Sequence, residues 1–141
     1  MISLARRSKR LREKRPTEAT TNRHHILYQN RYWKKGIAKK LRNDPIFIVH
    51  IDIDVHDRIH REVLTIPVPS CKGLKTLYER LQNERYWLDI MNPLGRIQWL
   101  INAIPNETDT CMALQRCRDI LCEEITPKVM QGDKAIAAYA F

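Results

Sequence analysis

Residues 46–60 read IFIVHIDIDVHDRIH and carry two periodicities in succession. The first half, 46–52, is rich in β-branched and aromatic residues and predicts a strand. Asp54 is an expected N-cap, and the apolar residues that follow recur every four positions, which predicts a helix over 55–64. His56 and His60 are also four apart, so they form a second stripe beside the apolar one. The sequence therefore predicts a strand followed at once by a helix that carries two neighbouring imidazoles.

All five histidines of the chain lie between residues 24 and 60. His24 and His25 stand before a short strand-like piece around residues 26–28, and His50 lies in the predicted strand, where a structural role is favoured. Histidines gathered in this way are typical of a metal or acid–base site, because imidazole titrates near neutral pH and ligates metals. Imidazoles from two well-anchored elements can hold one ion and leave a position open for a phosphate oxygen or water.

The order of these features, His-His-Ile at 24–26, then a strand, then His-x3-His on a helix, resembles the HNH group of ββα-metal nucleases over roughly residues 23–64. The resemblance implies a hairpin and a helix around one divalent ion (Mg²⁺, Mn²⁺ or Zn²⁺) and an endonuclease that hydrolyses phosphodiester bonds, usually in DNA. It implies metal ligands at His24, His56 and His60, and a general base at His25.

One position departs from the HNH pattern. The Asn that the family places nine residues before the helix histidine is Phe47 here, and a phenyl ring has no atom that can hold the base imidazole by a hydrogen bond. Two alternatives therefore stay open: a noncatalytic nucleic-acid-binding protein on a decayed nuclease fold, and a small phage or plasmid accessory protein that acts through a protein partner. His56-Asp57-x-x-His60 also resembles the HExxH of zinc proteases, but Asp replaces the Glu, which makes that reading less favoured.

Positive charge is concentrated at the front of the chain. Residues 1–42 hold 14 of the 25 Lys and Arg residues but two of the 16 acidic ones. Such a segment attracts polyanions, and we expect nucleic acid, DNA rather than RNA, as the partner. Residues 1–22 are expected to form a disordered basic arm. The expected nucleic-acid contacts are Arg6, Arg7, Lys9, Arg10, Arg12, Lys34, Lys35, Lys39, Lys40 and Arg42.

The rest of the chain predicts helices. Apolar residues at helical spacing lie between prolines throughout 70–141, with Ser70 and Asn106 as expected N-caps and with Tyr86, Trp87 and Trp99 as expected packing residues. The predicted fold class is therefore α+β: a basic arm over 1–22, an HNH-like ββα unit over 23–69, and a helical extension over 70–141 packed on it. This helical part is also the expected surface for a protein partner.

Several classes of protein are excluded or disfavoured by the composition. No apolar run reaches the roughly 18–20 residues of a membrane helix, and the N-terminus lacks the apolar region of a secretory signal. The four glycines are isolated, which excludes the glycine-rich nucleotide-binding loops, and no Ser stands in a GxSxG turn. The four cysteines form no CxxC pair, so they predict buried thiols in a reducing compartment. We expect the cytoplasm, of a host cell if the gene belongs to a mobile element.

Overall fold

A computed structural model of the chain describes residues 21–130, and the side chains of residues 21–124. Most of the predicted basic arm, with Arg6, Arg7, Lys9, Arg10 and Arg12, lies outside the described residues, and so do residues 131–141 of the predicted helical extension. The elements in chain order are β1 (Thr21–His25), α2 (Gly36–Arg42), the 3₁₀ turn η1 (Pro45–Phe47), β2 (Ile48–Asp52), α3 (Ile53–Glu62), α4 (Cys71–Asp89), α5 (Pro93–Ala103) and α6 (Thr108–Met130).

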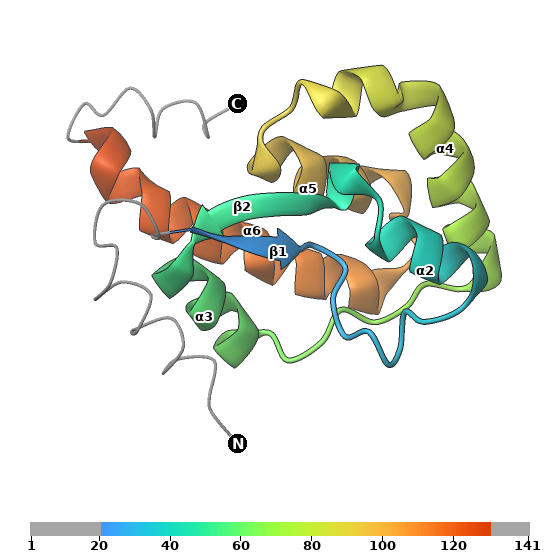
Figure 1. Cartoon of the computed structure of the whole chain (residues 1–141), viewed down its shortest axis with the longest axis horizontal. Coiled ribbons are helices and arrows are strands. Elements are labelled where there is room, and N and C mark those ends of the chain that lie inside the picture. Colours follow the sequence, from blue (N-terminus) through green and yellow to red (C-terminus); the bar gives the residue numbers. More distant parts are fainter. Residues whose placement is uncertain (1–20, 131–141) are drawn as a thin grey trace.

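The described chain is a small α+β protein, as the sequence predicts. β1 and β2 pair antiparallel in a two-stranded sheet, with α2 and η1 inserted between them. Figure 1 shows this sheet in front of α5 and α6, with α4 to one side. α3 contacts both strands and α6, and α5 contacts α4 and α6, so the helical part packs directly on the hairpin unit. No helix within residues 21–130 has the length and apolar character needed to cross a membrane.

One core joins the hairpin unit to the helices. Its largest fully buried side chains include Trp33 and Phe47 from the front of the chain and Leu77, Leu88 and Ile97 from the helical part. Burying apolar surface from both parts in one cluster is the main favourable term in folding. The two parts of the described chain therefore share a single core.

The first strand lies earlier in the sequence than predicted. Ile26, Leu27 and Tyr28, the predicted strand-like piece, follow β1, and all three side chains are buried. The Ile26 amide still donates to the Phe47 carbonyl at 2.8 Å, after which the chain leaves the sheet. The apolar character of these residues serves the core, whereas the polar sequence of Thr21–His25 forms the pairing strand.

Helix starts follow the predicted chemistry with two corrections. α3 begins at Ile53, because the Asp52 carboxylate, and not Asp54, caps it by accepting from the Asp54 amide at 2.9 Å. Ser70 caps α4 as predicted, accepting from the Gly73 amide at 3.1 Å. Asn106 does not cap the last helix, which begins two residues later at Thr108. Near the starts of α3 and α6, more than one residue has a side chain that could cap the helix, and tertiary packing selects the residue at which each helix begins.

Two further predictions about side-chain burial are corrected. Trp99 is buried, but Tyr86 and Trp87 are 73% and 60% exposed on α4 and contact each other edge to face. Ile90, directly after α4, is also 67% exposed. All four cysteines are free thiols; Cys117 is buried as predicted, whereas Cys71 at the start of α4 is exposed.

Candidate metal centre

The sheet register determines where the first histidine points. His24 lies opposite Val49 of β2, and both side chains are buried, whereas the neighbours His25 and Ile48 are half-buried. Side chains alternate between the two faces of a strand. His24 therefore projects from the face of the hairpin that packs on α3, and His25 projects from the opposite face.

α3 supplies the other two imidazoles. It follows β2 without a break and contacts both strands. His56 and His60 stand one turn apart on it, so they share a face. Their ring centroids lie 4.6 Å apart, and the His24 ring lies 5.1 Å from His56 and 5.2 Å from His60. Two elements that are remote in sequence thus bring three of the predicted ligands together.

These three residues, the three-histidine cluster, have the geometry of a metal site. One ligand nitrogen from each of His24, His56 and His60 lies within 4.8 Å of the other two. The Nδ1 atoms of His24 and His56 are buried and form no hydrogen bond within the described part of the chain. Buried polar atoms normally have partners, and nitrogens left without one are what a bound ion would satisfy. The residues present therefore fit a divalent ion.

Burial also sets the protonation of the cluster. It lowers the pKa of His24 well below the usual value, and the neighbouring His60 and His56 lower it further. Burial lowers the pKa of His56, and burial together with His56 lowers that of His60 to about 4. All three imidazoles are thus neutral near pH 7, and the neutral form is the one that binds metals.

A loop fastens α3 to the sheet next to this cluster. The side chains of Tyr28 and Gln29 donate to the carbonyls of Val63 and Leu64, and the Trp33 indole donates to the Ile66 carbonyl at 2.7 Å. The Tyr28 ring also packs 4.3 Å from the His60 ring, between centroids. Burial raises the pKa of Tyr28 above its ordinary value, which keeps the phenol a hydrogen-bond donor. Sequence reasoning missed Tyr28, because no local pattern shows that it meets α3.

The predicted base lies outside the three-histidine cluster. His25 is half-buried on the opposite face of β1, and its pKa is lowered by burial and then by the positive charges of Arg42 and Arg23. His50, for which a structural role was favoured, is exposed on β2 opposite Arg23. The structure thus divides the five histidines: three in the cluster and two on the other face of the hairpin.

The predicted basic contacts lie on and before α2. Lys34, Lys35, Lys39 and Lys40 are exposed, and Arg42 is half-buried at the end of the helix. Lys39, Lys40 and Arg42 stand in the last turn, where positive charge interacts favourably with the helix dipole. Ala38 and Leu41 anchor α2 in the core, and the Lys40 ammonium lies over the Tyr78 ring, 5.8 Å from its centroid.

Phe47 belongs to the core and not to the site. Its side chain is fully buried in η1, and its ring centroid lies 6.1 Å from that of Trp99. The position that the HNH pattern gives to an amide thus joins the hairpin unit to α5.

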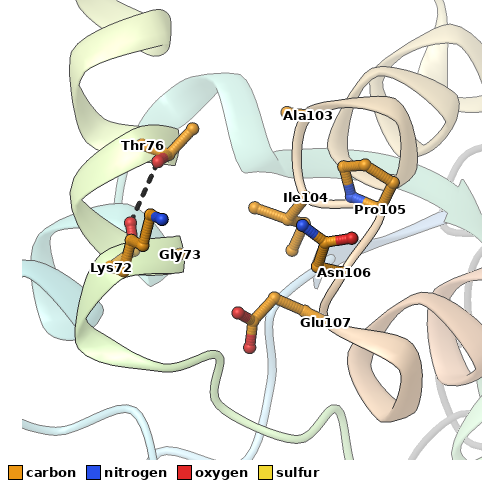
Figure 2. Close-up of a pocket in the computed structure, with 8 residues that line it drawn as sticks. All are labelled: Lys72, Gly73, Thr76, Ala103, Ile104, Pro105, Asn106 and Glu107. Atoms are coloured by element: carbon orange, nitrogen blue, oxygen red, sulfur yellow. Dashed lines mark hydrogen bonds between the residues drawn. The ribbon is translucent and has the colours of Figure 1, made fainter.

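A hollow lies elsewhere, where the start of α4 meets the α5–α6 connection. Figure 2 shows Glu107 and Asn106 facing Lys72 and Thr76 across it. Its volume is about 220 Å³. The Glu107 carboxylate accepts hydrogen bonds from the Ser70 amide at 2.8 Å and from the Ser70 hydroxyl at 2.7 Å. Through Ser70, the N-cap of α4, this carboxylate connects the start of α4 to the segment that precedes α6.

Comparison of the chain with models of protein families, with curated proteins and with solved structures finds no match.

Proposed function

We propose that this protein is a metal-dependent endonuclease of the HNH-like type, and that His24, His56 and His60 hold one divalent ion. The observation that carries the proposal is the convergence of three neutral imidazoles from β1 and α3: His24 and His56 are buried, each with an Nδ1 atom that has no partner among the described residues, and His60 is half-buried. The order strand, strand, helix around that cluster supports the resemblance to the ββα-metal group. The positive charge of residues 1–42 supports a polyanionic substrate.

The donor set favours a transition metal. Three nitrogen ligands suit Zn²⁺ and its neighbours, whereas Mg²⁺ prefers oxygen ligands in octahedral geometry. Three protein ligands also leave a coordination position open, as in catalytic zinc sites. A bound ion would supply charge neutralisation at the phosphodiester during bond cleavage.

The role proposed for His25 is to take a proton from the attacking water. His25 and His24 leave β1 on opposite faces, so both can act on one phosphate only around the outer edge of this strand. Within the described residues β1 pairs with β2 alone, so no other described strand occupies its outer edge. The positive charges of Arg42 and Arg23 near His25 favour an approaching phosphate.

Metal content and cleavage test the two parts of the proposal separately. The purified protein, stripped with a chelator and reloaded, is expected to bind one Zn²⁺ per chain. His56→Ala should weaken zinc binding by more than about 100-fold, because loss of a ligand costs more than the 10–100-fold typical of an outer partner. His50→Ala, which alters an exposed histidine outside the cluster, is the matched control and should keep the metal. A chain that binds no zinc, or a His56→Ala variant that binds it normally, contradicts the metal site.

Cleavage is measured on supercoiled plasmid with Zn²⁺, Mn²⁺ or Mg²⁺. The wild-type protein is expected to nick it, and His25→Ala should keep the metal but lose at least about 100-fold in rate, the lower range for a general base. A metal-loaded protein that binds DNA without nicking it would instead support the noncatalytic alternative. Phe47 favours that second candidate, because it leaves no amide to orient His25.

A further inference from the structure

Tyr32 is an exposed aromatic side chain in the loop between β1 and α2. Of the three aromatic residues in this loop, Tyr28 and Trp33 are buried, whereas Tyr32 is 51% exposed. Packing in the core thus explains Tyr28 and Trp33 but not Tyr32. Single exposed apolar side chains are common on protein surfaces, so the surroundings of this ring decide whether it has a function.

The turn that carries Tyr32 is held on both sides. The amides of Tyr32 and Trp33 donate to the Gln29 carbonyl at 2.9 and 3.2 Å. The Gln29 side chain donates to the Leu64 carbonyl, and the Trp33 indole donates to the Ile66 carbonyl at 2.7 Å. Figure 1 shows this loop beside the connection from α3 to α4, which contains both acceptors. The Tyr32 ring is therefore presented from an anchored turn, which lowers the entropy lost when it binds a partner.

Three positive charges, the loop cations Arg31, Lys34 and Lys35, surround this ring. The Arg31 guanidinium lies 4.8 Å from the centroid of the Tyr32 ring. Lys34 and Lys35 are exposed and follow within three residues, so their α carbons lie at most about 11 Å from that of Tyr32. No Asp or Glu occurs between residues 19 and 43. No ion pair within the described part of the chain joins a loop cation to a carboxylate, so an external anion would displace no such partner.

An exposed aromatic ring among positive charges matches the alternating bases and phosphates of an unpaired nucleic-acid strand. An aromatic side chain can stack on the face of any base, and guanidinium and ammonium groups bind the phosphates. In a duplex the faces of the bases are covered by neighbouring base pairs, so a tyrosine ring has no base to stack on. An acidic peptide would use the loop cations but would have no need of the ring.

We propose that Tyr32 stacks on an unpaired base of a nucleic-acid strand, and that the loop cations hold the phosphates beside that base. This inference rests on the proposed function in taking nucleic acid as the substrate, and it specifies a substrate that is single-stranded at the point of contact. The same loop carries Tyr28, whose ring lies 4.3 Å from that of His60, between centroids. The base-binding turn and the three-histidine cluster are thus attached to one anchored loop.

The test measures binding of a short, fluorescein-labelled oligothymidine by anisotropy in the presence of a chelator. Tyr32→Ala should lower the affinity about 10-fold, the size expected for one stacked base, whereas Tyr32→Phe keeps the ring and should bind within about 2-fold of wild type. Because Tyr32→Ala removes no charge, the slope of log affinity against log salt should stay the same. Arg31→Gln should lower that slope by about 0.7, the value for one phosphate contact on a single strand.

Two controls separate base stacking from a general effect of the substitution. Tyr86→Ala removes another exposed tyrosine ring, on α4, and should change the affinity by less than about 2-fold. An abasic oligonucleotide of the same length keeps the phosphates but has no bases. The wild-type protein and Tyr32→Ala should bind it equally, because nothing is left for the ring to stack on.

Equal binding of oligothymidine by Tyr32→Ala and Tyr86→Ala would overturn the inference. A loss in Tyr32→Ala that is as large on the abasic oligonucleotide would also overturn it. Wild-type binding of polyglutamate as tight as that of oligothymidine would overturn it too and would indicate an acidic protein as the partner. Tyr32→Leu, which keeps apolar bulk without an aromatic face, should lose the same affinity and replaces Tyr32→Ala if that variant does not fold.

The inference and the proposed endonuclease can fail separately, because the binding assay contains no metal. Weakened oligothymidine binding by Tyr32→Ala, with no plasmid nicking by the wild-type protein, would reject the endonuclease and retain the base contact. Nicking by the wild-type protein, with unchanged oligothymidine binding by Tyr32→Ala, would retain the endonuclease and reject the base contact.

Discussion

The imidazoles of His24, His56 and His60 contact one another and are largely shielded from solvent. His24 and His56 are 3% and 8% exposed, and each of these rings meets the other two edge to face. Burying a polar ring without hydrogen-bond partners costs free energy that the core around it has to offset. Such a cost is typical of functional positions, where a ligand completes what the chain leaves open.

Next to the three-histidine cluster, Tyr28 contributes a hydrogen bond whose effect on stability can be measured directly. Tyr28→Phe removes the hydrogen bond to the Val63 carbonyl but keeps the ring against His60. We expect the free energy of unfolding to fall by about 1–2 kcal/mol, because a buried acceptor loses its donor. Urea denaturation measures it, and zinc stoichiometry should stay near one.

Tyr32→Phe is the matched control for this substitution. Tyr32 is 51% exposed, so the loss of its hydroxyl should change stability by less than about 0.5 kcal/mol. Equal effects of the two substitutions would show that the Tyr28 hydrogen bond does not stabilise the loop against α3.

At the scale of elements, α3 is held in place from two sides. On one side, the loop 26–33 donates hydrogen bonds to the segment that follows α3. On the other side, Arg58 of α3 pairs with Glu62 of the same helix and with Glu123 and Glu124 of α6. Isolated surface pairs contribute little, but a network that joins two helices limits their relative movement. The position of His56 and His60 relative to β1 depends on this anchoring.

A second junction joins η1 to α4 through Asp44. Its carboxylate accepts from both terminal nitrogens of Arg85, at 2.9 and 2.7 Å, and from the Ile46 amide at 3.0 Å. Burial would raise the pKa of Asp44, but the hydrogen bonds from Arg85 and Ile46 and the charge of Arg85 lower it below its ordinary value. The charged form is therefore the one that stabilises the fold.

The pH dependence of this junction follows from the sign of the shift. A carboxyl whose pKa is lower in the folded state contributes stability above its unfolded value near 3.8, and loses it as the pH falls through its folded value. Asp44→Asn is expected to lower the free energy of unfolding by about 1–2 kcal/mol at pH 7. The difference from wild type should shrink below about pH 4. A gap that stays constant from pH 7 to pH 3 would contradict a charged Asp44, and Asp109→Asn on α6 serves as the exposed control.

On the scale of the whole molecule, the three-histidine cluster joins elements that are far apart in the sequence. His24 enters it from β1 and the other two ligands from α3, which packs on α6. An ion bound by these residues would cross-link elements that unfolding separates. Binding and folding are then coupled, because the ligands converge only in the folded chain.

Zinc is therefore expected to stabilise the whole protein. At a free concentration about 100 times its dissociation constant, it should raise the free energy of unfolding by about 2.7 kcal/mol. Thermal denaturation with and without zinc measures this, and His56→Ala should abolish the increase. A melting temperature that does not respond to zinc in the wild-type protein would contradict binding at these concentrations.

Local patterns in the chain predict much of this structure. The strand before α3, the cap at Ser70 and the pairing of His56 with His60 on one helix face all follow from neighbours within a few positions. Where the prediction was wrong, several local readings competed. Ile26, Leu27 and Tyr28 are apolar residues that suit a strand and a buried loop equally. In the structure they form a buried loop after β1. Tyr86 and Trp87 are large aromatic residues, which favours a packing role, yet both side chains are exposed on α4.

What the sequence alone establishes is therefore the α+β class, the uneven charge and the side chains that can ligate a metal, because these depend on composition and short-range periodicity. Only the tertiary structure brings His24 to His56 and His60, turns His25 to the other face of the hairpin with Arg23, and places Tyr28 against α3. Those relations depend on strand register and on the packing of a helix against a sheet, and both are set by contacts between residues far apart in the chain.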